Sequence, residues 1–413
     1  MKIFKFGGAS VKDAESVKNV ALVLENQGFG QCLLVVSAMG KTTNALEKVV
    51  QLYFEKGDYH QAVQNIKSKH IEIAEGLFQS NHPVFSEIKL FFDDLESFLR
   101  RNKSPNYNFV YDQVVSCGEM ISSKILSEYL NENQFQNQWL DARDYIKTDN
   151  TYREGVINWE ETQKNIDNLD KTVSYVTQGF IGSDENSFSI TLGREGSDYS
   201  AAIFAYCTNA ESMTIWKDVP GVMTGDPRKF EEVQLLTHIS YEEAIEMAYY
   251  GASVIHPKTL QPLQQKNIPF FVKSFIYPEK EGTKIGNSDD NQKIESYILK
   301  ENQILLKIDT KDFSFVAEDH MSQIFSRLAQ HKIKVSLIQN SAISLDLCLE
   351  DKYNHCDLLV KDLENNFNID ITKNVSLFTV RNVDMNNMEK FYQNKTILLE
   401  QISRQTLQMI TLP

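Results

Sequence analysis

The chain has 413 residues, more than one ordinary hydrophobic core accommodates, so its length indicates two or three domains. Its residues are 42% hydrophobic and 11% aromatic, which is typical of a globular protein and excludes a disordered one. The formal net charge of −14 argues against a surface for nucleic acid or for an anionic membrane, so any phosphate has to be met by a few local cations.

The first third of the chain predicts an α/β beginning followed by a block of helices. Residues 3–6 and 32–36 are short runs of aliphatic or aromatic residues that end in turn residues, a pattern typical of strands. From about residue 45 to 135 the apolar residues recur with the helical period and glycines are few. We therefore predict a helical block there, in which residues 116–119 open a helix that continues to residue 129.

Strands return in the middle of the chain and alternate with helices. Residues 173–176, 189–192 and 213–216 have strand character, and residues 241–250 have helical spacing. Residues 251–258 are predicted to form a turn and a strand behind that helix. Strands that alternate with helices indicate the α/β class, with a largely parallel central sheet flanked by helices.

The composition changes at residues 277–283 and 287–293, which are polar and rich in turn residues. Such segments connect domains more often than they lie inside one. We therefore predict a first domain over residues 1–285, a linker over residues 286–300 and a second region over residues 301–413.

The second region carries the pattern of a small α+β module. Residues 304–308, 334–338 and 342–347 resemble strands and residues 321–330 an amphipathic helix, which gives the order strand, helix, strand, strand. After about residue 376 the sequence predicts only a strand, a short helix and a final strand pair.

The N-terminus and the cysteines indicate the compartment. The first eight residues lack the apolar core of a signal peptide, and no apolar run reaches the length of a membrane-spanning helix. The five cysteines are an odd number without C-x-x-C spacing, so we expect reduced core thiols rather than disulfides or a zinc site. We therefore expect a cytoplasmic protein with no membrane or nucleic-acid partner.

Lys5 is the first candidate for chemistry. It lies between Phe4 and Phe6 in a short apolar strand and is followed by Gly7 and Gly8. A buried ammonium group without a partner is costly, so one interpretation is an edge strand with Lys5 in solvent. The other is that the lysine and the glycine backbone amides face phosphate oxygens.

The segment 191–202 carries the strongest single signal. An apolar run ends in two glycines that bracket Arg194, and Ser197 and Asp198 follow before a small-residue stretch that could open a helix. Free N–H groups at a helix start attract an anion, and Arg194 adds a planar fork suited to a carboxylate or a phosphate. Asp198 could hold a metal or hold a lysine in place. An ordinary turn capped by Ser197 or Asp198 is the simpler alternative.

Residues 39–43, Met-Gly-Lys-Thr-Thr, look at first like a Walker A phosphate loop. The glycine that this pattern needs five positions before Gly40 is Val35, so we reject that interpretation. What remains is Ser37 after a strand and Thr43 at a helix start, each either a ligand contact or a simple cap.

Glu119 and a later loop complete the candidates. A glutamate in a first helical turn is often placed there by the helix dipole alone, whereas a functional Glu119 would receive the ammonium group of an amino acid. Lys217, Asp218 and Arg228 gather on a loop with Pro-Gly and Asp-Pro turns, which suits recognition of a nucleotide. His256 is interpreted as a packed histidine rather than as a base.

Taken in order, these segments resemble the aspartate kinases of the amino-acid kinase superfamily. The motifs that carry the resemblance are Lys5-Phe-Gly-Gly8, residues 36–40, Gly118-Glu119, and residues 191–198, 218–228 and 251–257. No single motif is specific, but their number and order are. The resemblance implies an amino-acid kinase catalytic domain over residues 1–285 and an amino-acid-sensing ACT-like region over residues 301–413. A complete second ACT module does not fit the length that remains after the first.

The resemblance implies transfer of the γ-phosphoryl group of ATP to the side-chain carboxylate of L-aspartate, the first step toward lysine, threonine and methionine. It implies two catalytic residues, Lys5 and Asp198, with Asp198 orienting Lys5. The implied substrate pocket consists of Ser37, Thr43, Glu119, Arg194 and Ser197. The implied nucleotide site consists of Lys5, Phe6, Gly7, Gly8, Lys217, Asp218, Met223, Arg228, Ser253 and Val254. Mg²⁺ would enter with ATP, held mainly by phosphates and water without a dedicated protein site. A homodimer through the ACT-like region is expected.

Four positions depart from the family pattern. Glu195 stands where a small residue is usual, and a carboxylate there could weaken the grip of the neighbouring arginine on substrate. Met223 replaces a tyrosine, Ser253 replaces a nucleotide-contacting lysine and Ala9 replaces a threonine. None of the four removes the lysine, arginine or aspartate that we take to be essential.

Two groups of alternatives remain open. A related kinase of the same superfamily would phosphorylate glutamate, acetylglutamate, carbamate or a nucleoside monophosphate, but Glu119 together with Arg194 favours an amino acid. A catalytically weak, ACT-based amino-acid sensor or partner subunit would keep the kinase fold, and Glu195 and Ser253 are its support in the sequence. We expect an active aspartate kinase.

Overall fold

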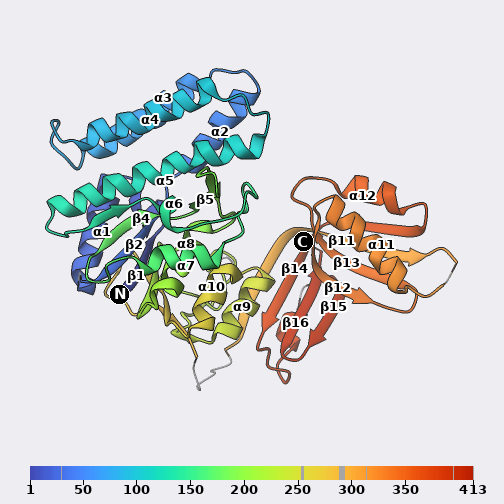
Figure 1. Cartoon of the computed structure of the whole chain (residues 1–413). Helices are drawn as coiled ribbons and strands as arrows, with labels where there is room; N and C mark the ends of the chain where they lie inside the picture. Colours follow the sequence, from blue (N-terminus) through green and yellow to red (C-terminus); the bar gives the residue numbers. More distant parts are fainter. Residues whose placement is uncertain (29, 253–254, 288–293, 313, 394, 413) are drawn as a thin grey trace. The chain divides into compact units, whose positions relative to one another are not determined.

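The chain divides into two compact units. The computed structural model describes residues 1–28, 30–252, 255–287, 294–312, 314–393 and 395–412 (Figure 1). The first unit comprises residues 1–222, 235–245 and 255–290, and the second comprises residues 223–234, 246–254 and 291–413. Two segments from the middle of the chain therefore belong to the second unit. The first strand after the expected domain boundary begins at Ser296, inside the linker that was expected over residues 286–300.

Eight strands form the main sheet of the first unit, in the order β3-β4-β2-β1-β7-β9-β10-β8. They are β1 (Lys2–Phe6), β2 (Cys32–Val36), β3 (Gln138–Leu140), β4 (Tyr175–Gln178), β7 (Ser212–Lys217), β8 (His238–Ile239), β9 (Phe270–Ser274) and β10 (Thr283–Ile285). All neighbouring pairs are parallel except β9 with β10, so the predicted, largely parallel sheet is confirmed. The strand expected at residues 189–192 lies outside this sheet, because β5 (Ile181–Ser183) and β6 (Ser189–Thr191) form a separate antiparallel pair.

Helices cover both faces of the main sheet. Within residues 1–287 they are α1 (Ala14–Gln27), α2 (Thr42–Phe54), α3 (Tyr59–Glu75), α4 (Val84–Arg101), α5 (Tyr107–Glu132), α6 (Ala142–Tyr145), α7 (Trp159–Asp167), α8 (Gly196–Thr208), α9 (Tyr241–Tyr250) and α10 (Pro257–Gln265). Side chains of a strand alternate between its two faces. In β1, Phe4 and Phe6 join a core with α1 and α5, whereas Lys5 points to the opposite face, toward α8.

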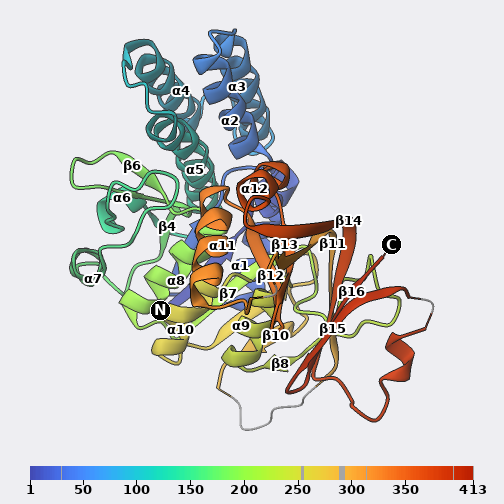
Figure 2. The same ribbon diagram turned by 90° about the vertical axis from the view of Figure 1, so that its right-hand side faces the viewer.

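The predicted helical block is confirmed as α2, α3, α4 and α5. Figures 1 and 2 show α3 and α4 on the far side of this block from the sheet. The expectation that residues 116–119 open a helix is wrong. α5 already begins at Tyr107, where the Asn106 side chain accepts hydrogen bonds from two backbone N–H groups. Gly118 lies inside α5 for a packing reason, because a Cβ there would stand 3.0 Å from the Thr42 side chain of α2.

The strand expected within residues 251–258 does not occur in the described part of that segment. Residues 253 and 254 lie outside the described residues, and α10 begins at Pro257. The Lys258 N–H donates a hydrogen bond to His256 Nδ1 at 3.2 Å, and a proline at the first helical position has no N–H to satisfy. The His-Pro pair therefore starts a helix, and His256 caps it.

A six-stranded antiparallel sheet organises the second unit, in the order β12-β13-β11-β14-β16-β15. Its elements are β11 (Ser296–Thr310), α11 (Glu318–Gln330), β12 (Lys334–Asn340), β13 (Ser344–Glu350), α12 (Cys356–Leu363), β14 (Phe367–Arg381), the 3₁₀ helix η2 (Glu389–Phe391), β15 (Ile397–Ser403) and β16 (Thr406–Thr411). The predicted order strand, helix, strand, strand is confirmed by β11 to β13, and the predicted final strand pair by β15 and β16. α11 and α12 pack through Ile324 and Leu359 on one face of β11 and β13 (Figure 2).

Two further expectations concern the whole chain. The five cysteines are all buried and none forms a disulfide, which confirms the prediction of core thiols. Burial raises the pKa of the Cys117 thiol to about 12, so this group stays protonated at neutral pH. Among the described residues, no helix combines the length and the apolar character needed to cross a membrane.

Candidate active site

The carboxyl ends of three neighbouring strands meet at the centre of the main sheet. β1 lies between β2 and β7, and Phe6 stands level with Val36 on one side and with Trp216 on the other. The loops that follow these strands therefore begin side by side, and they carry the predicted glycine pair, Ser37 and Lys217. In open α/β sheets this edge is the usual place for a ligand.

A buried ion-pair cluster lies at this edge. The Lys5 ammonium group is 2.6 Å from Asp198 Oδ1, and the Lys217 ammonium group is 3.7 Å from Oδ2. Lys5 is 8% exposed and Asp198 is 3% exposed, so each buried charge depends on an opposite charge nearby. Burial raises the pKa of Asp198, but Lys5 and Lys217 outweigh it and hold that pKa below its ordinary value. The edge-strand alternative for Lys5 is wrong, because β1 is central and Lys5 is paired.

The glycine pair after β1 brings two loops into contact. A Cβ on Gly8 would stand 2.7 Å from the Ala38 carbonyl oxygen, which leaves no room for a side chain. The Gly40 N–H donates a hydrogen bond to the Gly8 carbonyl at 2.9 Å. Gly7 lies beside the cation, since a Cβ there would stand 3.5 Å from Lys5 Nζ. The backbone after β1 is therefore packed closely next to the ion-pair cluster.

The turn between β6 and α8 delivers Asp198 to this cluster. Gly193, with φ of 78°, and Glu195, with φ of 53°, reverse the chain before the helix begins at Gly196. No side chain caps the helix, and Ser197 and Asp198 lie within its first turn, so the alternative of a capping serine or aspartate is wrong. The Asp198 carboxylate faces the lysines instead of the helix backbone.

Arg194 and Ser197 lie on either side of the helix start. Arg194 is exposed in the turn that precedes α8. A Cβ on Gly179 would stand 2.5 Å from Ser197 Cβ, so the backbone that follows β4 packs directly on the first turn of α8. The Ser200 hydroxyl accepts a hydrogen bond from the Phe180 N–H at 2.9 Å and fixes this contact.

Glu195 is the irregular residue of the turn. A non-glycine residue in the left-handed region costs about 1–2 kcal/mol. Its Oε2 atom is buried and has no hydrogen-bond partner among the described residues. Burial and the neighbouring Asp198 raise the pKa of Glu195, whereas Lys217, Arg194 and Lys5 lower it, and the net direction is upward.

A second buried carboxylate lies on α5, where three predicted pocket residues come together. Glu119 is 2% exposed, and Thr43 donates only a long hydrogen bond of 3.5 Å to Oε1. Its Oε2 atom has no hydrogen-bond partner among the described residues. One turn farther along, the Ser122 hydroxyl donates to the Ser37 carbonyl at 2.7 Å. Burial raises the pKa of Glu119 to about 8.

Asp112 ties α5 to β6, the strand that leads into the turn before α8. Its Oδ2 accepts hydrogen bonds from the Arg153 N–H at 2.9 Å and from the Thr191 N–H at 3.0 Å. Its Oδ1 accepts a bond of 2.7 Å from the Thr191 hydroxyl. Burial raises the pKa of Asp112 to about 6, although all of these donors favour the ionised form.

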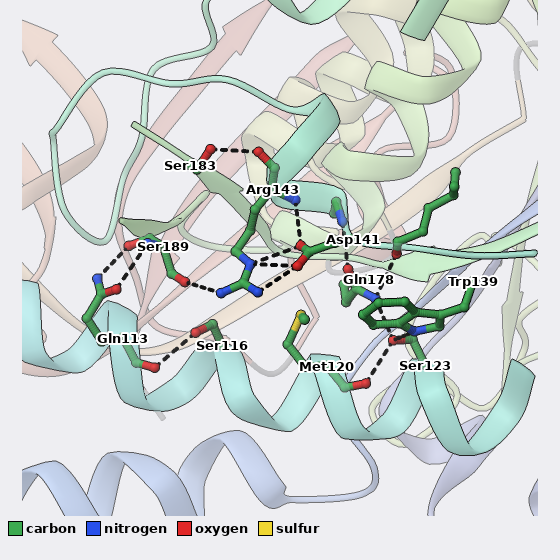
Figure 3. A network of polar contacts seen from close by, with 12 residues as sticks. Gln113, Ser116, Met120, Ser123, Trp139, Asp141, Arg143, Gln178, Ser183 and Ser189 are labelled. Atoms are coloured by element: carbon green, nitrogen blue, oxygen red, sulfur yellow. Dashed lines mark hydrogen bonds and ion pairs between the residues drawn. The ribbon is translucent and has the colours of Figure 1, made fainter. Parts of the chain in front are cut away.

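Figure 3 shows a polar network that supports the same side of α5. The Gln113 side chain exchanges two hydrogen bonds with the Ser189 backbone, at 2.8 and 3.1 Å. The Arg143 guanidinium contacts Asp141 at 2.6 Å and the Ser189 hydroxyl at 3.2 Å. The Gln178 amide, at the end of β4, donates to the Ser123 hydroxyl of α5 at 2.7 Å. The network fixes the helix that carries Glu119 against β4 and β6.

Sequence reasoning missed these supporting residues. Gln178 had a usable signal, because it is a polar residue two positions after the strand predicted at residues 173–176. Asp112 had none, since its partners lie 41 and 79 residues away along the chain. Arg143 likewise reaches a serine 46 residues away. Only the folded chain brings such partners together.

The predicted nucleotide residues in the first unit flank the ion-pair cluster. Lys217 ends β7 and contacts Asp198, and the exposed Asp218 follows it directly. The Phe6 ring is fully buried and stacks on Trp216 with 7° between the ring planes, so only its backbone could contact a ligand.

The remaining nucleotide candidates belong to other parts of the chain. Met223 and Arg228 lie in the second unit. The Arg228 side chain is 81% exposed and pairs with Asp226 at 2.7 Å. Ser253 and Val254 lie outside the described residues. The structure therefore places Lys5, Gly7, Gly8, Lys217 and Asp198 together, and the roles of Met223, Arg228, Ser253 and Val254 stay predictions.

Comparisons with known proteins all point to one protein family. The family model described as the amino acid kinase family matches residues 1–274. The lysine-sensitive aspartokinase 3 of Escherichia coli is 32% identical over 361 residues, which is 84% of this chain and 78% of that protein. The chloroplastic aspartokinase 2 of Arabidopsis thaliana is 29% identical over 399 residues, covering 88% of this chain and 70% of that protein.

The bifunctional relatives are longer than this chain. A bifunctional aspartokinase/homoserine dehydrogenase of Buchnera aphidicola is 29% identical over 372 residues, and the match covers 86% of this chain but only 44% of that protein. The chain thus spans less than half of the length of that relative.

Solved structures show the same fold. The E. coli aspartokinase III structure with aspartate and ADP, called the R-state, matches with a TM-score of 0.84 and 27% identity, covering 100% of this chain and 96% of that one. The T-state structure of the same enzyme, with lysine and aspartate, has a TM-score of 0.83 and 28% identity, covering 99% and 95%. The predicted α/β fold with a C-terminal α+β region is confirmed. With its Lys5–Asp198 cluster at the carboxyl edge of the sheet, the chain belongs to the amino acid kinase family and, within that family, to the aspartokinases.

Proposed function

We propose that this aspartokinase transfers the γ-phosphoryl group of ATP to the side-chain carboxylate of L-aspartate and forms 4-phospho-L-aspartate. The observation that carries the proposal is the buried Lys5–Asp198 pair at the carboxyl end of the central strand. Phosphoryl transfer asks the protein for positioning and charge stabilisation more than for covalent chemistry. The acceptor carboxylate needs no general base, because it is ionised at neutral pH.

Lys5 and the backbone beside it act on the transferring group. The ammonium group of Lys5 neutralises charge that develops on the phosphoryl oxygens, and the Gly7 and Gly8 amides lie next to it. Asp198 orients Lys5 through the 2.6 Å ion pair and is itself held by Lys217 on its other oxygen. Because both partners are buried in a fixed geometry, little reorganisation is needed when substrates bind.

The other end of the site binds aspartate. Arg194 clamps a substrate carboxylate with its planar fork, and its exposure leaves the guanidinium accessible. Glu119 receives the substrate ammonium group, which supplies the partner that its buried Oε2 lacks. Ser37, Thr43 and Ser197 complete the pocket with neutral hydrogen-bonding groups.

ATP is the phosphoryl donor, and the solved relative that contains ADP supports nucleotide use. The residues proposed to line the nucleotide site beyond the glycine pair are Phe6, through its backbone, Lys217, Asp218, Met223, Arg228, Ser253 and Val254. Mg²⁺ bound with ATP neutralises phosphate charge. The site fits such a cation, since a buried and unpartnered carboxylate oxygen at Glu195 is the hard ligand that Mg²⁺ takes.

The alternative of a catalytically weak sensor is not favoured. The matched relatives are aspartokinases, and none of the departures at Glu195, Met223 or Ser253 removes the Lys5–Asp198 pair. A hydroxylamine trap for acyl phosphate tests the proposal directly, with MgATP and a panel of aspartate, glutamate, acetylglutamate, carbamate and UMP. We expect turnover with aspartate, and no turnover with aspartate at saturating MgATP would refute the proposal.

The second unit carries the remaining proposals. Its β11-α11-β12-β13-α12-β14 order gives one ACT-like module, and β15, β16 and η2 add a shorter, helix-poor part that we propose to be a truncated second module. We propose a cytoplasmic homodimer through residues 301–413. Light scattering of the full chain should give twice the chain mass, and a monomer at micromolar concentration would contradict that assignment.

A further inference from the structure

Glu195 occupies a position where its side chain lacks the usual reasons to be there. It is the N-cap residue of α8 in the left-handed region, whereas N-cap residues normally have extended backbone and a side chain that caps the helix. The Glu195 side chain makes no such cap. Other described non-glycine residues, such as Lys56 and Gln134, share the left-handed conformation, so it is the Glu195 carboxylate and not the backbone alone that points to a ligand.

Glu195 lies at the start of the helix that carries Asp198, next to the ion-pair cluster. Glu195 and Asp198 are the N-cap and third residues of α8, so the two carboxylates belong to the same helical turn. The Asp198 N–H also donates to the Glu195 carbonyl at 3.0 Å. Both carboxylate oxygens of Asp198 face lysines, Lys5 and Lys217, whereas Glu195 Oε2 is buried without a hydrogen-bond partner among the described residues.

An unpaired carboxylate in this place would repel an incoming nucleotide. The phosphates of ATP carry several negative charges, and like charges at short range in a partly buried site are strongly unfavourable. Lys5, Lys217 and Arg194 together cannot offset both carboxylates and all the charges of the phosphates at once. A divalent cation between Glu195 and the phosphate oxygens would turn the repulsion into attraction, and Mg²⁺ takes one or two carboxylates together with substrate phosphates.

We infer that Glu195 is a direct ligand of the Mg²⁺ that enters with the nucleotide, so that this chain adds a protein carboxylate to a metal otherwise held by phosphates and water. The inference rests on the proposed function, because it requires that the site bind a nucleotide. It makes Glu195 a metal-binding residue and not a defect beside Arg194.

The test measures how strongly Mg²⁺ and ADP assist each other's binding. Calorimetric titration of ADP, with and without Mg²⁺, is carried out on the native chain, on Glu195→Gln and on Glu160→Gln. The last variant is a matched control, because Glu160 is an exposed residue of α7 outside the site. We expect the Mg²⁺ enhancement of ADP affinity to be at least tenfold smaller in Glu195→Gln than in the other two proteins. ADP without metal should bind Glu195→Gln as tightly as the native chain or more tightly, since a repulsive charge is gone.

The other outcomes are informative as well. Equal Mg²⁺ enhancement in all three proteins would overturn the inference. A change confined to aspartate affinity would also overturn it, because Glu195 would then face the amino acid. If the native chain binds no ADP with or without Mg²⁺, the proposed function fails first and the inference with it. Glu195→Gly, which removes the whole side chain and relieves the backbone, should reproduce the loss of enhancement and guards against a folding artefact of the glutamine.

Discussion

The turn before α8 and the middle of α5 each bury a carboxylate, but they treat its charge in opposite ways. Asp198 is 3% exposed and faces two lysines, which hold its pKa below the ordinary value against the effect of burial. Glu119 is 2% exposed, and although the Thr43 hydroxyl at 3.5 Å and the backbone of Ala38 and Glu119 favour its ionised form, burial raises its pKa to about 8. Burial alone therefore does not decide the charge of a carboxylate, since the partners do.

The difference separates two kinds of preparation for catalysis. The Lys5–Asp198 cluster has its charges matched inside the protein, so it is ready before substrates arrive. The buried Glu119 Oε2 atom has no hydrogen-bond partner among the described residues, and the ammonium group of an amino acid can supply one. In the proposed function, the first region stabilises the transferring phosphoryl group and the second binds the acceptor. Each of the following variants changes one side of this comparison.

The largest effect is expected from Lys5→Met, which removes the cation closest to Asp198 and leaves that carboxylate poorly paired, as Glu119 is. The cation that we propose to be catalytic is lost, and of its two lysines Asp198 retains Lys217 at 3.7 Å. We expect kcat/KM for aspartate to fall about 10³-fold or more, in line with the loss of a charge that stabilises a phosphoryl transition state. The measurement is steady-state acyl-phosphate formation.

Lys2→Met is the control for this experiment. Lys2 lies on the same strand, is exposed and stands at the opposite end from the site. It should leave kcat/KM within about twofold, as surface substitutions usually do. If Lys5→Met kept more than a tenth of the native activity while folded, the role given to Lys5 would be wrong.

The next largest effect is a pH dependence of the KM for aspartate, and it comes from Glu119. Because the pKa of Glu119 is about 8, the ionised form that binds an ammonium group grows tenfold per pH unit below that value. The KM for aspartate should therefore fall by up to tenfold per unit from pH 6 to 8 and level off above it. In Glu119→Gln this pH dependence should vanish, with a KM about tenfold or more above the native value at pH 8.

Above pH 8, Glu119→Gln should weaken aspartate binding but increase the stability of the fold. A carboxyl group whose folded pKa is raised stabilises the fold fully below its ordinary pKa of 4.5 and loses that contribution as the pH rises to about 8. Above pH 8 the glutamine variant should therefore resist urea better than the native chain. A variant that is less stable than the native chain at pH 9 would show that the hydrogen bonds to the ionised form outweigh the cost of its burial.

How much of this could be predicted from sequence differs between the two regions. The residues of the matched region follow short strands or begin a helix, so Lys5, Arg194 and Asp198 stood next to visible turn signals. The region around Glu119 lies inside a helix of 26 residues, where residues 116–119, with Gly118 among them, were mistaken for a helix start. That glycine answers to α2, which packs against it, and helix-to-helix contact leaves no local signal.

The second limit is the set of hydrogen bonds between segments that lie far apart in the sequence. The sequence predicted the parallel sheet and the C-terminal strand pair, since periodicity and turn residues are local. It did not predict that Asp112 would accept hydrogen bonds from Arg153 and Thr191, because three segments have to fold before these atoms meet. It also took His256-Pro257 for part of a strand, although the pair is an adequate helix start.

Asp112 tests an intermediate case, a buried carboxylate satisfied by neutral donors. Asp112→Ala leaves two backbone N–H groups and one hydroxyl unpartnered, so we expect a loss of about 2–3 kcal/mol in the free energy of unfolding. In Asp112→Asn the amide oxygen can accept both N–H bonds while the NH₂ group donates to the Thr191 hydroxyl, so the loss at pH 5 should stay below about 1 kcal/mol.

The pH dependence of the Asp112 variants gives the control. The folded pKa of about 6 lies above the ordinary value, so the stabilisation from the native carboxyl is lost as the pH rises from about 4 to 6. Asp112→Asn should therefore gain on the native chain between pH 5 and pH 8 in urea unfolding. A constant difference across this range would mean that Asp112 is ionised throughout, as Asp198 is.

The smallest effect is expected at Glu195, which lies next to the ion-pair cluster but whose own Oε2 atom has no hydrogen-bond partner among the described residues. Glycine adopts φ of 53° without a steric penalty, so Glu195→Gly should raise the free energy of unfolding by about 1 kcal/mol, or the Tm by about 2–4 °C. Glu195→Gln keeps the strained backbone and should gain less than half of that. Differential scanning calorimetry of both variants separates backbone strain from charge. If glycine destabilises the chain, the turn needs the glutamate for folding. If glycine stabilises it, the residue is retained at a cost, which is expected of a ligand and not of a structural side chain.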